Sequence, residues 1–168
     1  MIYIITDTHF NHKKMVEWGR PADFEKQIWD SLLALSSEDL LIHLGDICIS
    51  GDKETHEMLR RVKAKKILIK GNHDEKSDHW YMQNGWDFVC HTYTNHYFGK
   101  HIVFTHEPFN MLEKYGDINI HGHFHGGTHH KYEFSHIYEE NYHKDFSLEK
   151  YGYKAVALEK HLKTIGVI

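Results

Sequence analysis

Cysteine is scarce in this chain of 168 residues, which contains only Cys48 and Cys90. Two cysteines cannot build the disulfide framework of a small secreted domain, so we expect a protein of a reducing compartment. Long hydrophobic runs are also missing. The longest apolar run near the N-terminus, Ile2–Ile5, is too short for the core of a signal peptide or for a membrane span. The sequence therefore predicts a soluble, cytoplasmic protein with no attachment to a membrane.

Proline is also rare, and an excess of positive charge is absent. Pro21 and Pro108 are the only prolines, and no segment is rich in Gly and Ser as a flexible linker would be, so we expect one domain over residues 1–168. The 20 Lys and Arg residues are outnumbered by 24 Asp and Glu, which leaves a net charge of −4. This balance argues against a broad nucleic-acid-binding face. A hydrophobic fraction of 40% excludes intrinsic disorder.

Histidine, in contrast, is abundant, with 18 residues. It is the commonest ligand of transition metals in proteins and the usual acid or base near neutral pH. The positions of the histidines in the chain are therefore candidates for a metal site.

The first half of the chain alternates between strand-like and helix-like segments. Three continuous apolar runs, Ile2–Ile5 and residues 40–44 and 67–69, are typical of strands covered on both faces. Between them, residues 23–35 and 52–62 carry apolar side chains at helical spacing. This order predicts a parallel sheet with helical crossovers.

The second half is richer in strands. We expect strands at residues 88–94, 102–105, 118–121 and 153–158, a turn at residues 95–100 and a short helix at residues 159–162. Residues 126–144 are polar and rich in histidine and tyrosine, which predicts a surface loop.

Side chains that can bind a metal ion follow five of the expected strands, those that end at residues 5, 44, 69, 105 and 121. They are Asp7 and His9, then Asp46, then Asn72, His73 and Asp74, then His106, and finally His121, His123 and His125. Sheets of this kind bind ligands beyond the carboxyl ends of their strands, so we expect these groups to converge.

Carboxylates, an amide and several imidazoles suit two transition-metal ions held close together. A carboxylate such as Asp46 can bridge two cations and reduce their repulsion. This ligand mixture favours Mn, Fe, Zn or Ni, and the absence of thiolates argues against a structural zinc site. Two ions roughly 3.5–4 Å apart can hold a hydroxide and clamp the oxygens of a displacement at phosphorus.

Five short motifs follow one another along the chain: Asp7-Thr8-His9, Gly45-Asp46, Gly71-Asn72-His73-Asp74, Thr105-His106 and Gly122-His123-Phe124-His125. In this order they resemble the calcineurin-like metallophosphoesterase superfamily. Residues 7–12, Arg20-Pro21 and residues 153–158 are similar to a small, capless bacterial and phage branch, which often has a proline where Ala155 stands here. The resemblance implies a mixed α/β fold, a four-layer α-β-β-α sandwich in which helices flank two mixed sheets.

The resemblance also implies a role for each site residue. Asp7, His9 and His125 would hold the first metal, Asn72, His106 and His123 the second, and Asp46 would bridge them. His73 would face the phosphate, stabilise the developing charge and protonate the leaving oxygen, and Asp74 would orient His73. The nucleophile would be a metal-bound water or hydroxide.

Two further residues and one segment each allow two interpretations. His12 either lies near the phosphate or starts the turn that follows it, and Arg20 either binds substrate or anchors the loop before Pro21. Within residues 126–144, the histidines 129, 130, 136 and 143 form either an extra metal site or part of a solvated loop.

The predicted function is hydrolysis of a phosphoester with two divalent ions, with manganese first among the metals considered. We favour a phosphodiester over a phosphomonoester, because the chain leaves no room for a capping domain, and a nucleotide is one candidate substrate. A phosphomonoesterase of the same mechanism is the alternative. A non-catalytic interaction scaffold and a histidine-rich metal buffer belong to other functional classes. The sequence identifies neither the physiological substrate, the native metal, the host nor the oligomeric state.

Overall fold

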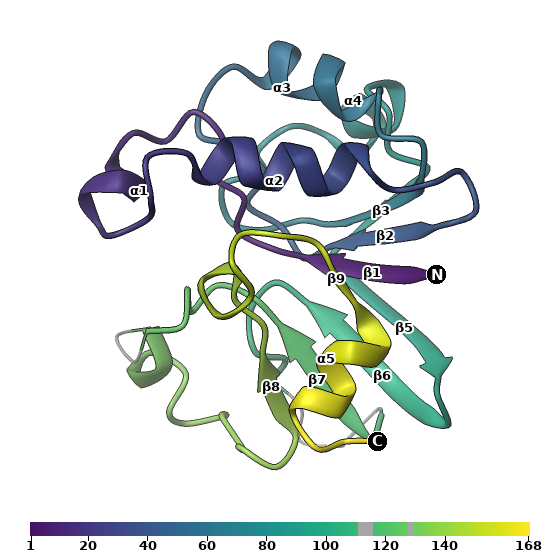
Figure 1. The fold of residues 1–168 in the computed structure, drawn as a ribbon. Coiled ribbons are helices and arrows are strands. Elements are labelled where there is room, and N and C mark those ends of the chain that lie inside the picture. Colours follow the sequence, from purple (N-terminus) through teal and green to yellow (C-terminus); the bar gives the residue numbers. More distant parts are fainter. Residues whose placement is uncertain (111–115, 128–129) are drawn as a thin grey trace.

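The computed structural model describes residues 1–110, 116–127 and 130–168, and its strands form two sheets that pack face to face (Figure 1). Helices flank the two sheets, as the sequence predicts for a mixed α/β fold.

The first sheet has five strands in the order β4-β3-β2-β1-β9. Its strands are β1 (Ile2–Ile5), β2 (Leu40–His43), β3 (Lys65–Ile69), β4 (Phe88–Cys90) and β9 (Val156–Ala157). β1 to β4 run parallel, and β9 pairs antiparallel with β1. Above this sheet in Figure 1 lie the helices α2 (Phe24–Leu33), α3 (Asp52–Leu59) and α4 (Asp78–Gln83), and α1 (Lys14–Glu17) lies to their left.

The second sheet has four strands in the order β5-β6-β7-β8. They are β5 (Thr92–Tyr97), β6 (Lys100–Thr105), β7 (Ile118–His121) and β8 (His143–Asp145). β5 and β6 form an antiparallel hairpin, whereas β6, β7 and β8 run parallel. The remaining described helices are α5 (Leu158–Thr164), which packs against β1 and β9, and the 3₁₀ helices η1 (His130–Tyr132) and η2 (Leu148–Tyr151).

Two hydrophobic layers explain why the strands of the first sheet are apolar throughout. Ile5 and Leu41 point towards the helices, where Ile28 and Leu32 of α2 cover them. Ile4 of the same strand points the other way, into the core shared with the second sheet. Successive side chains of a strand face opposite sides, so a strand between two layers needs no polar residue on either face.

The strand expected at residues 88–94 is wrong in extent. It is two strands, β4 and β5, which belong to different sheets, and the chain passes between the sheets at His91. β4 and β5 are each the outermost strand of their sheet. The weak alternation of apolar and polar residues over this segment predicts extended chain, but it does not show where the chain leaves one sheet and enters the other.

The turn expected at residues 95–100 is shorter than predicted. Asn95 to Tyr97 continue β5 and pair with β6, in spite of their polarity, because they lie on an outer strand with exposed faces. Only Phe98 and Gly99 turn the chain, with φ angles of 53° and 74°. The late strand is likewise reduced to Val156–Ala157, and the loop expected over residues 126–144 contains η1 and the start of β8.

The longest described helix, α2, has 10 residues, and within the described ranges no helix is long and apolar enough to cross a membrane.

Candidate metal centre

The predicted site residues lie at the carboxyl ends of five strands. Asp7 and His9 follow β1, Asp46 follows β2, residues 72–74 follow β3, His106 follows β6, and His123 and His125 follow β7. β1, β2 and β3 are parallel, so their ends meet at one edge of the first sheet. The second sheet packs against the first and brings the ends of β6 and β7 to the same place.

One group of ligand atoms forms around Asp7. Its Oδ1 lies 3.4 Å from His125 Nε2 and 3.7 Å from His9 Nε2, and the two imidazole nitrogens are 3.3 Å apart. The other oxygen, Oδ2, accepts hydrogen bonds from the Thr6 hydroxyl and the His123 backbone N–H. Oδ1 is buried and has no hydrogen-bond partner in the described chain. A buried carboxylate oxygen left in this way beside two imidazole nitrogens fits a cation.

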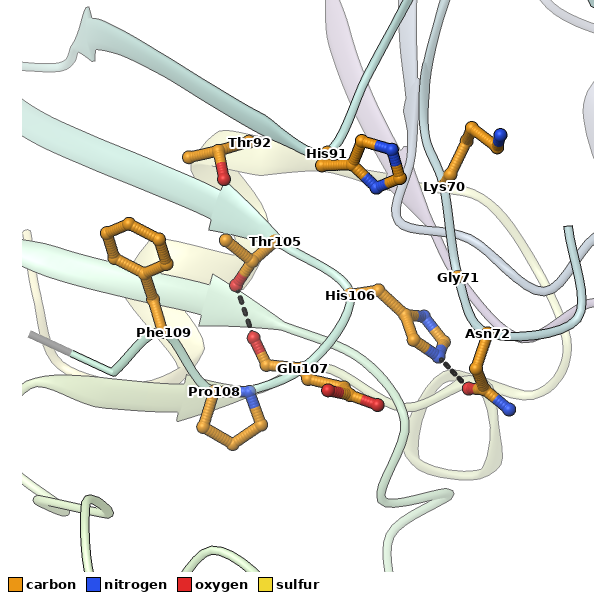
Figure 2. Close-up of a pocket in the computed structure, with 10 residues that line it drawn as sticks. All are labelled: Lys70, Gly71, Asn72, His91, Thr92, Thr105, His106, Glu107, Pro108 and Phe109. Atoms are coloured by element: carbon orange, nitrogen blue, oxygen red, sulfur yellow. Dashed lines mark hydrogen bonds between the residues drawn. The ribbon is translucent and has the colours of Figure 1, made fainter. Parts of the chain in front are cut away.

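A second group forms around His106. Its Nε2 lies 3.0 Å from Asn72 Oδ1 (Figure 2). The same nitrogen lies 3.2 Å from His123 Nδ1. On the other side of the ring, Nδ1 lies 2.7 Å from the carbonyl oxygen of Leu44, which can only accept a hydrogen bond. A neutral His106 therefore carries its proton on Nδ1 and turns the Nε2 lone pair towards Asn72 and His123, the arrangement usual for a metal-binding histidine.

Asp46 lies between the two groups. Its Oδ2 is 3.5 Å from His9 Nε2 of the first group and 3.5 Å from His106 Nε2 of the second. Its Oδ1 accepts a hydrogen bond from the His73 backbone N–H. Burial raises the pKa of Asp46 to about 6, and the nearby Asp7 adds to this effect while His106 opposes it. The charged form of this carboxylate is thus poorly stabilised by the protein alone, as expected of a group that accepts a cation.

Burial alone would raise the pKa of Asp7, but the nearby imidazoles of His9, His106 and His125 hold that pKa well below its ordinary value.

Five of the seven predicted ligands adopt a left-handed backbone conformation, which non-glycine residues rarely do. Their φ angles are 48° for Asp7, 44° for His9, 59° for Asp46, 69° for His123 and 49° for His125. Such strain costs on the order of 1–3 kcal/mol for each residue and is concentrated at functional sites. The fold therefore holds the backbone in an energetically unfavourable, left-handed conformation at the positions where the ligand atoms converge.

Comparison with known proteins identifies the family. The model of the calcineurin-like phosphoesterase family matches residues 1–158. The chain belongs to this family. An uncharacterized protein of Methanocaldococcus jannaschii, MJ1445, is 29% identical over 133 residues, which are 70% of this chain and 75% of that protein.

Two solved structures resemble this phosphoesterase over nearly its whole length. Protein AQ665 of Aquifex aeolicus, of unknown function, superposes with a TM-score of 0.76 at 26% identity and covers 98% of both chains. An archaeal phosphodiesterase superposes with a TM-score of 0.55 at 17% identity and covers 95% of this chain and 94% of its own. The second likeness supports the fold.

His73 is set apart from the seven ligand positions. Its side chain is 47% exposed, and its Nε2 lies 3.9 Å from Asp46 Oδ2. The ring meets the His9 ring edge-on, with the centroids 5.5 Å apart. This phosphoesterase thus presents an accessible imidazole beside both ligand groups.

Asp74 does not have the partner that we expected. Its hydrogen bonds in the described chain come from three backbone N–H groups, those of Asp46, Ile47 and Gly71, at 2.8 to 3.1 Å, and not from the His73 ring. The expectation that Asp74 orients His73 is therefore replaced by another function. The buried carboxylate ties the loop after β2 to the loop after β3, because backbone N–H groups in such tight turns need an acceptor.

His12 and Arg20 both lie on the side of the first ligand group. The His12 ring is 5.6 Å from the His9 ring and meets Trp18 edge-on. Arg20 is 4% exposed, and its Nη2 lies 2.8 Å from a Glu149 oxygen and 3.4 Å from His125 Nδ1. This pairing favours the interpretation of Arg20 as an anchor.

Sequence reasoning missed the polar connection between the loops after β1 and β2. The buried His43 accepts a hydrogen bond from the Gly45 N–H through Nδ1, and its Nε2 lies 3.1 Å from the Thr8 hydroxyl. That hydroxyl donates to the carbonyl oxygen of Ile47. A histidine inside an apolar strand was the only sequence signal of this connection.

The histidine-rich segment approaches the second group at one point. The His130 ring lies 4.8 Å from the His123 ring, and Glu133 completes a cluster of possible ligands with these two residues. His143 contacts Glu139 and Phe109, His136 is exposed, and position 129 lies outside the described residues.

Two glycines leave space that the carboxylates fill. A Cβ atom at Gly122 would collide with the Thr6 hydroxyl and lie 2.6 Å from Asp7 Oδ2, and one at Gly71 would collide with Asp46 Oδ1. Both carboxylates could keep their positions only if the backbone moved.

We expect Gly122→Ala to displace Asp7 and to weaken metal binding by the first group. Overpacking of this kind typically lowers the free energy of unfolding by about 1–3 kcal/mol. Metal titration and urea unfolding measure the two effects. Gly127→Ala is the matched control, because the nearest atom to its new Cβ lies 3.4 Å away. Metal affinity that is the same in both variants would contradict the predicted displacement.

Buried histidines make the metal-free protein sensitive to acid. Burial, the largest cause in each case, lowers the pKa of His43 and His121 to about 3 and that of His9, His123 and His161 to about 4. Near pH 5 these five groups are protonated in the unfolded chain and mostly neutral in the folded one. Asp46 has the opposite effect, since its raised pKa lets the folded state bind a proton, and so do Asp74 and Asp145, whose pKa values burial also raises. His106 acts in the same direction as these carboxylates, because the charges of Asp7 and Asp46 raise its pKa against the effect of burial.

Burial also lowers the pKa of His12 and His56, so the histidines with a lowered pKa outnumber the four groups with a raised one. The unfolded state therefore binds more protons, and stability falls as the pH decreases from about 6.5 to about 4. The slope is about 1.4 kcal/mol per pH unit for each net proton. Urea unfolding with a chelator at pH 7 and pH 5 measures it. His161 lies away from the metal centre, and His161→Phe should make the unfolding free energy less dependent on pH. A urea concentration at the unfolding midpoint that is the same at pH 7 and pH 5 would refute the prediction.

Proposed function

We propose that residues 1–168 form one phosphoesterase domain that uses two divalent metal ions to hydrolyse a phosphodiester. The observation that carries this proposal is the position of Asp46 Oδ2, 3.5 Å from a histidine nitrogen of each ligand group. Asp7, His9 and His125 would hold one ion, Asn72, His106 and His123 the other, and Asp46 would touch both. When bound, two such ions supply positive charge for the phosphate oxygens and activate water as a nucleophile.

The residues of the chain would supply positioning and one proton. His73 is accessible beside Asp46, so its imidazole can reach a phosphate oxygen and protonate the leaving alcohol. Its backbone N–H meanwhile holds Asp46 Oδ1, which leaves Oδ2 to face the ligand groups. Asp74 keeps the loops that carry Asp46 and His73 together through their backbones.

A diester is favoured over a monoester because the site is open. The described residues form two sheets with their helices and loops, and within them no separate capping unit covers the strand ends. An open site can accept a second substituent on phosphorus. Manganese is the first metal to test, with iron, zinc and nickel as alternatives, since all four accept imidazole and carboxylate ligands.

The test compares two chromogenic substrates, bis(p-nitrophenyl) phosphate and p-nitrophenyl phosphate, with protein stripped by a chelator and reloaded with Mn²⁺. We expect about two ions per chain, turnover that depends on the metal, and a higher kcat/KM for the diester. A higher value for the monoester would indicate a phosphatase. Metal binding without turnover of either ester would indicate a metal buffer. If the protein neither binds metal nor hydrolyses either ester, an interaction scaffold is indicated.

A further inference from the structure

A cavity of about 400 Å³ opens beside the second ligand group. Figure 2 shows its two ends. Asn72 and His106 lie at one end, and the Phe109 ring lies at the other, with Thr105 between them. A phosphate held at Asn72 and His106 would therefore direct one of its substituents along this cavity.

The wall that carries Phe109 is held in place through its backbone. The Phe109 N–H donates a hydrogen bond to Asn119 Oδ1, and its carbonyl oxygen lies 3.1 Å from His143 Nε2. The Thr105 hydroxyl donates to the carbonyl oxygen of Glu107 (Figure 2). The backbone of this wall is thus fixed by hydrogen bonds that a substitution of the Phe109 side chain leaves in place.

The lining of the cavity suits a planar, uncharged group better than a second phosphate. Phe109 and Pro108 provide apolar surface, and His91 provides a further ring. Lys70, the only lysine or arginine among the described lining residues, is paired with Asp78, and Glu107 carries a negative charge. Any of the nucleobases can stack on an aromatic ring, because every base is a planar heterocycle with a π-face.

His73 does not line this cavity. If His73 protonates the leaving alcohol, the cavity holds the other substituent, which stays on phosphorus. We propose that this substituent is a nucleoside, with its base against Phe109, so that the substrate is a nucleotide diester and the product a nucleoside monophosphate. This inference depends on the proposed phosphodiesterase function and specifies its substrate class.

The test uses two diesters that share a leaving group. Thymidine 5′-(p-nitrophenyl phosphate) and methyl p-nitrophenyl phosphate each react with one water, which forms a new phosphorus–oxygen bond as the bond to p-nitrophenolate breaks. The products are p-nitrophenol with thymidine 5′-phosphate in the first case and with methyl phosphate in the second. The ratio of the two kcat/KM values, nucleoside over methyl, therefore reports on the retained substituent alone.

Phe109→Ala should lower this ratio about tenfold, and Phe109→Tyr should restore it, because the loss of one stacked ring has an effect of this order. Calorimetric titration with thymidine 5′-phosphate should show a similar loss of affinity. Phe98→Ala is the control, since Phe98 is exposed at the far end of the β5–β6 hairpin and should leave the ratio unchanged.

Two results would overturn the assignment of this cavity while leaving the phosphodiesterase function in place. One is an unchanged ratio in Phe109→Ala. The other is a ratio that falls in Trp18→Ala instead, because the exposed Trp18 lies next to His12, on the side of the first ligand group. If the metal-loaded wild-type protein hydrolyses neither diester, the proposed function itself fails.

Discussion

Asp46→Asn is expected to lower metal content and activity together. The amide can still accept the hydrogen bond from the His73 N–H through its oxygen. Its NH₂ group would then point to the place where Asp46 Oδ2 approaches His9 and His106, and an amide nitrogen neither carries negative charge nor binds a cation. Removal of a residue that only hydrogen-bonds to a metal ligand typically lowers metal affinity about 10–100-fold. Asp46 is itself a predicted ligand, so we expect a loss at least that large.

Elemental analysis and steady-state kinetics on the same preparation measure the two quantities. The metal-free variant should be no less stable than the metal-free wild type, because the carboxylate that it loses is buried and has a raised pKa. Asp30→Asn provides the control, since Asp30 is paired with Lys26 on the exposed face of α2. Two ions per chain with wild-type turnover in Asp46→Asn would disprove the bridging position.

His73→Ala is expected to do the opposite: to keep the metal ions and lose the rate. The contact of His73 with Asp46 Oδ1 is made by its backbone, so removal of the ring leaves this hydrogen bond intact. Loss of a general acid or of a charge-stabilising group typically lowers the rate about 10²–10⁴-fold. The loss should be larger for an alkyl leaving group than for p-nitrophenolate, because the poorer leaving group needs the proton more.

Metal content, kcat for the two leaving groups and recovery with added imidazole distinguish this role from a structural one. His79→Ala, on the exposed side of α4, is the matched control. If His73→Ala instead loses an ion and regains its rate in excess Mn²⁺, His73 is a metal ligand and the assigned role is wrong.

The positions of the predicted ligands in the chain followed from local sequence. Polar side chains directly after apolar runs predict convergence at a sheet edge, since β1 to β3 are parallel and end together. The seven positions do come together in two groups that share Asp46. Their spacing in the sequence is enough for this because each strand is short and its end is sharply defined by the turn that follows.

The partners of the side chains were less predictable. Asp74 follows His73 in the sequence, so an interaction between the two was a natural expectation, yet its carboxylate accepts hydrogen bonds from three backbone groups of two loops. Arg20 is similar, because Glu149, its partner in an ion pair, is 129 residues away in the chain. Two polar residues can be neighbours in the sequence without pairing, and distant residues can pair. Which polar groups need a partner depends on how the loops pack.

The amino-acid sequence by itself determined the family motifs, the two-layered core and the chemical nature of the candidate metal centre. These depend on which residue types stand at strand ends and in apolar runs, and both are local properties of the chain. Only the tertiary structure decided that residues 88–97 cross from one sheet to the other, that five ligand positions are left-handed, and that a cavity lies between Asn72 and Phe109. These features arise where the two sheets meet, and their geometry is set by the packing of segments far apart in the sequence.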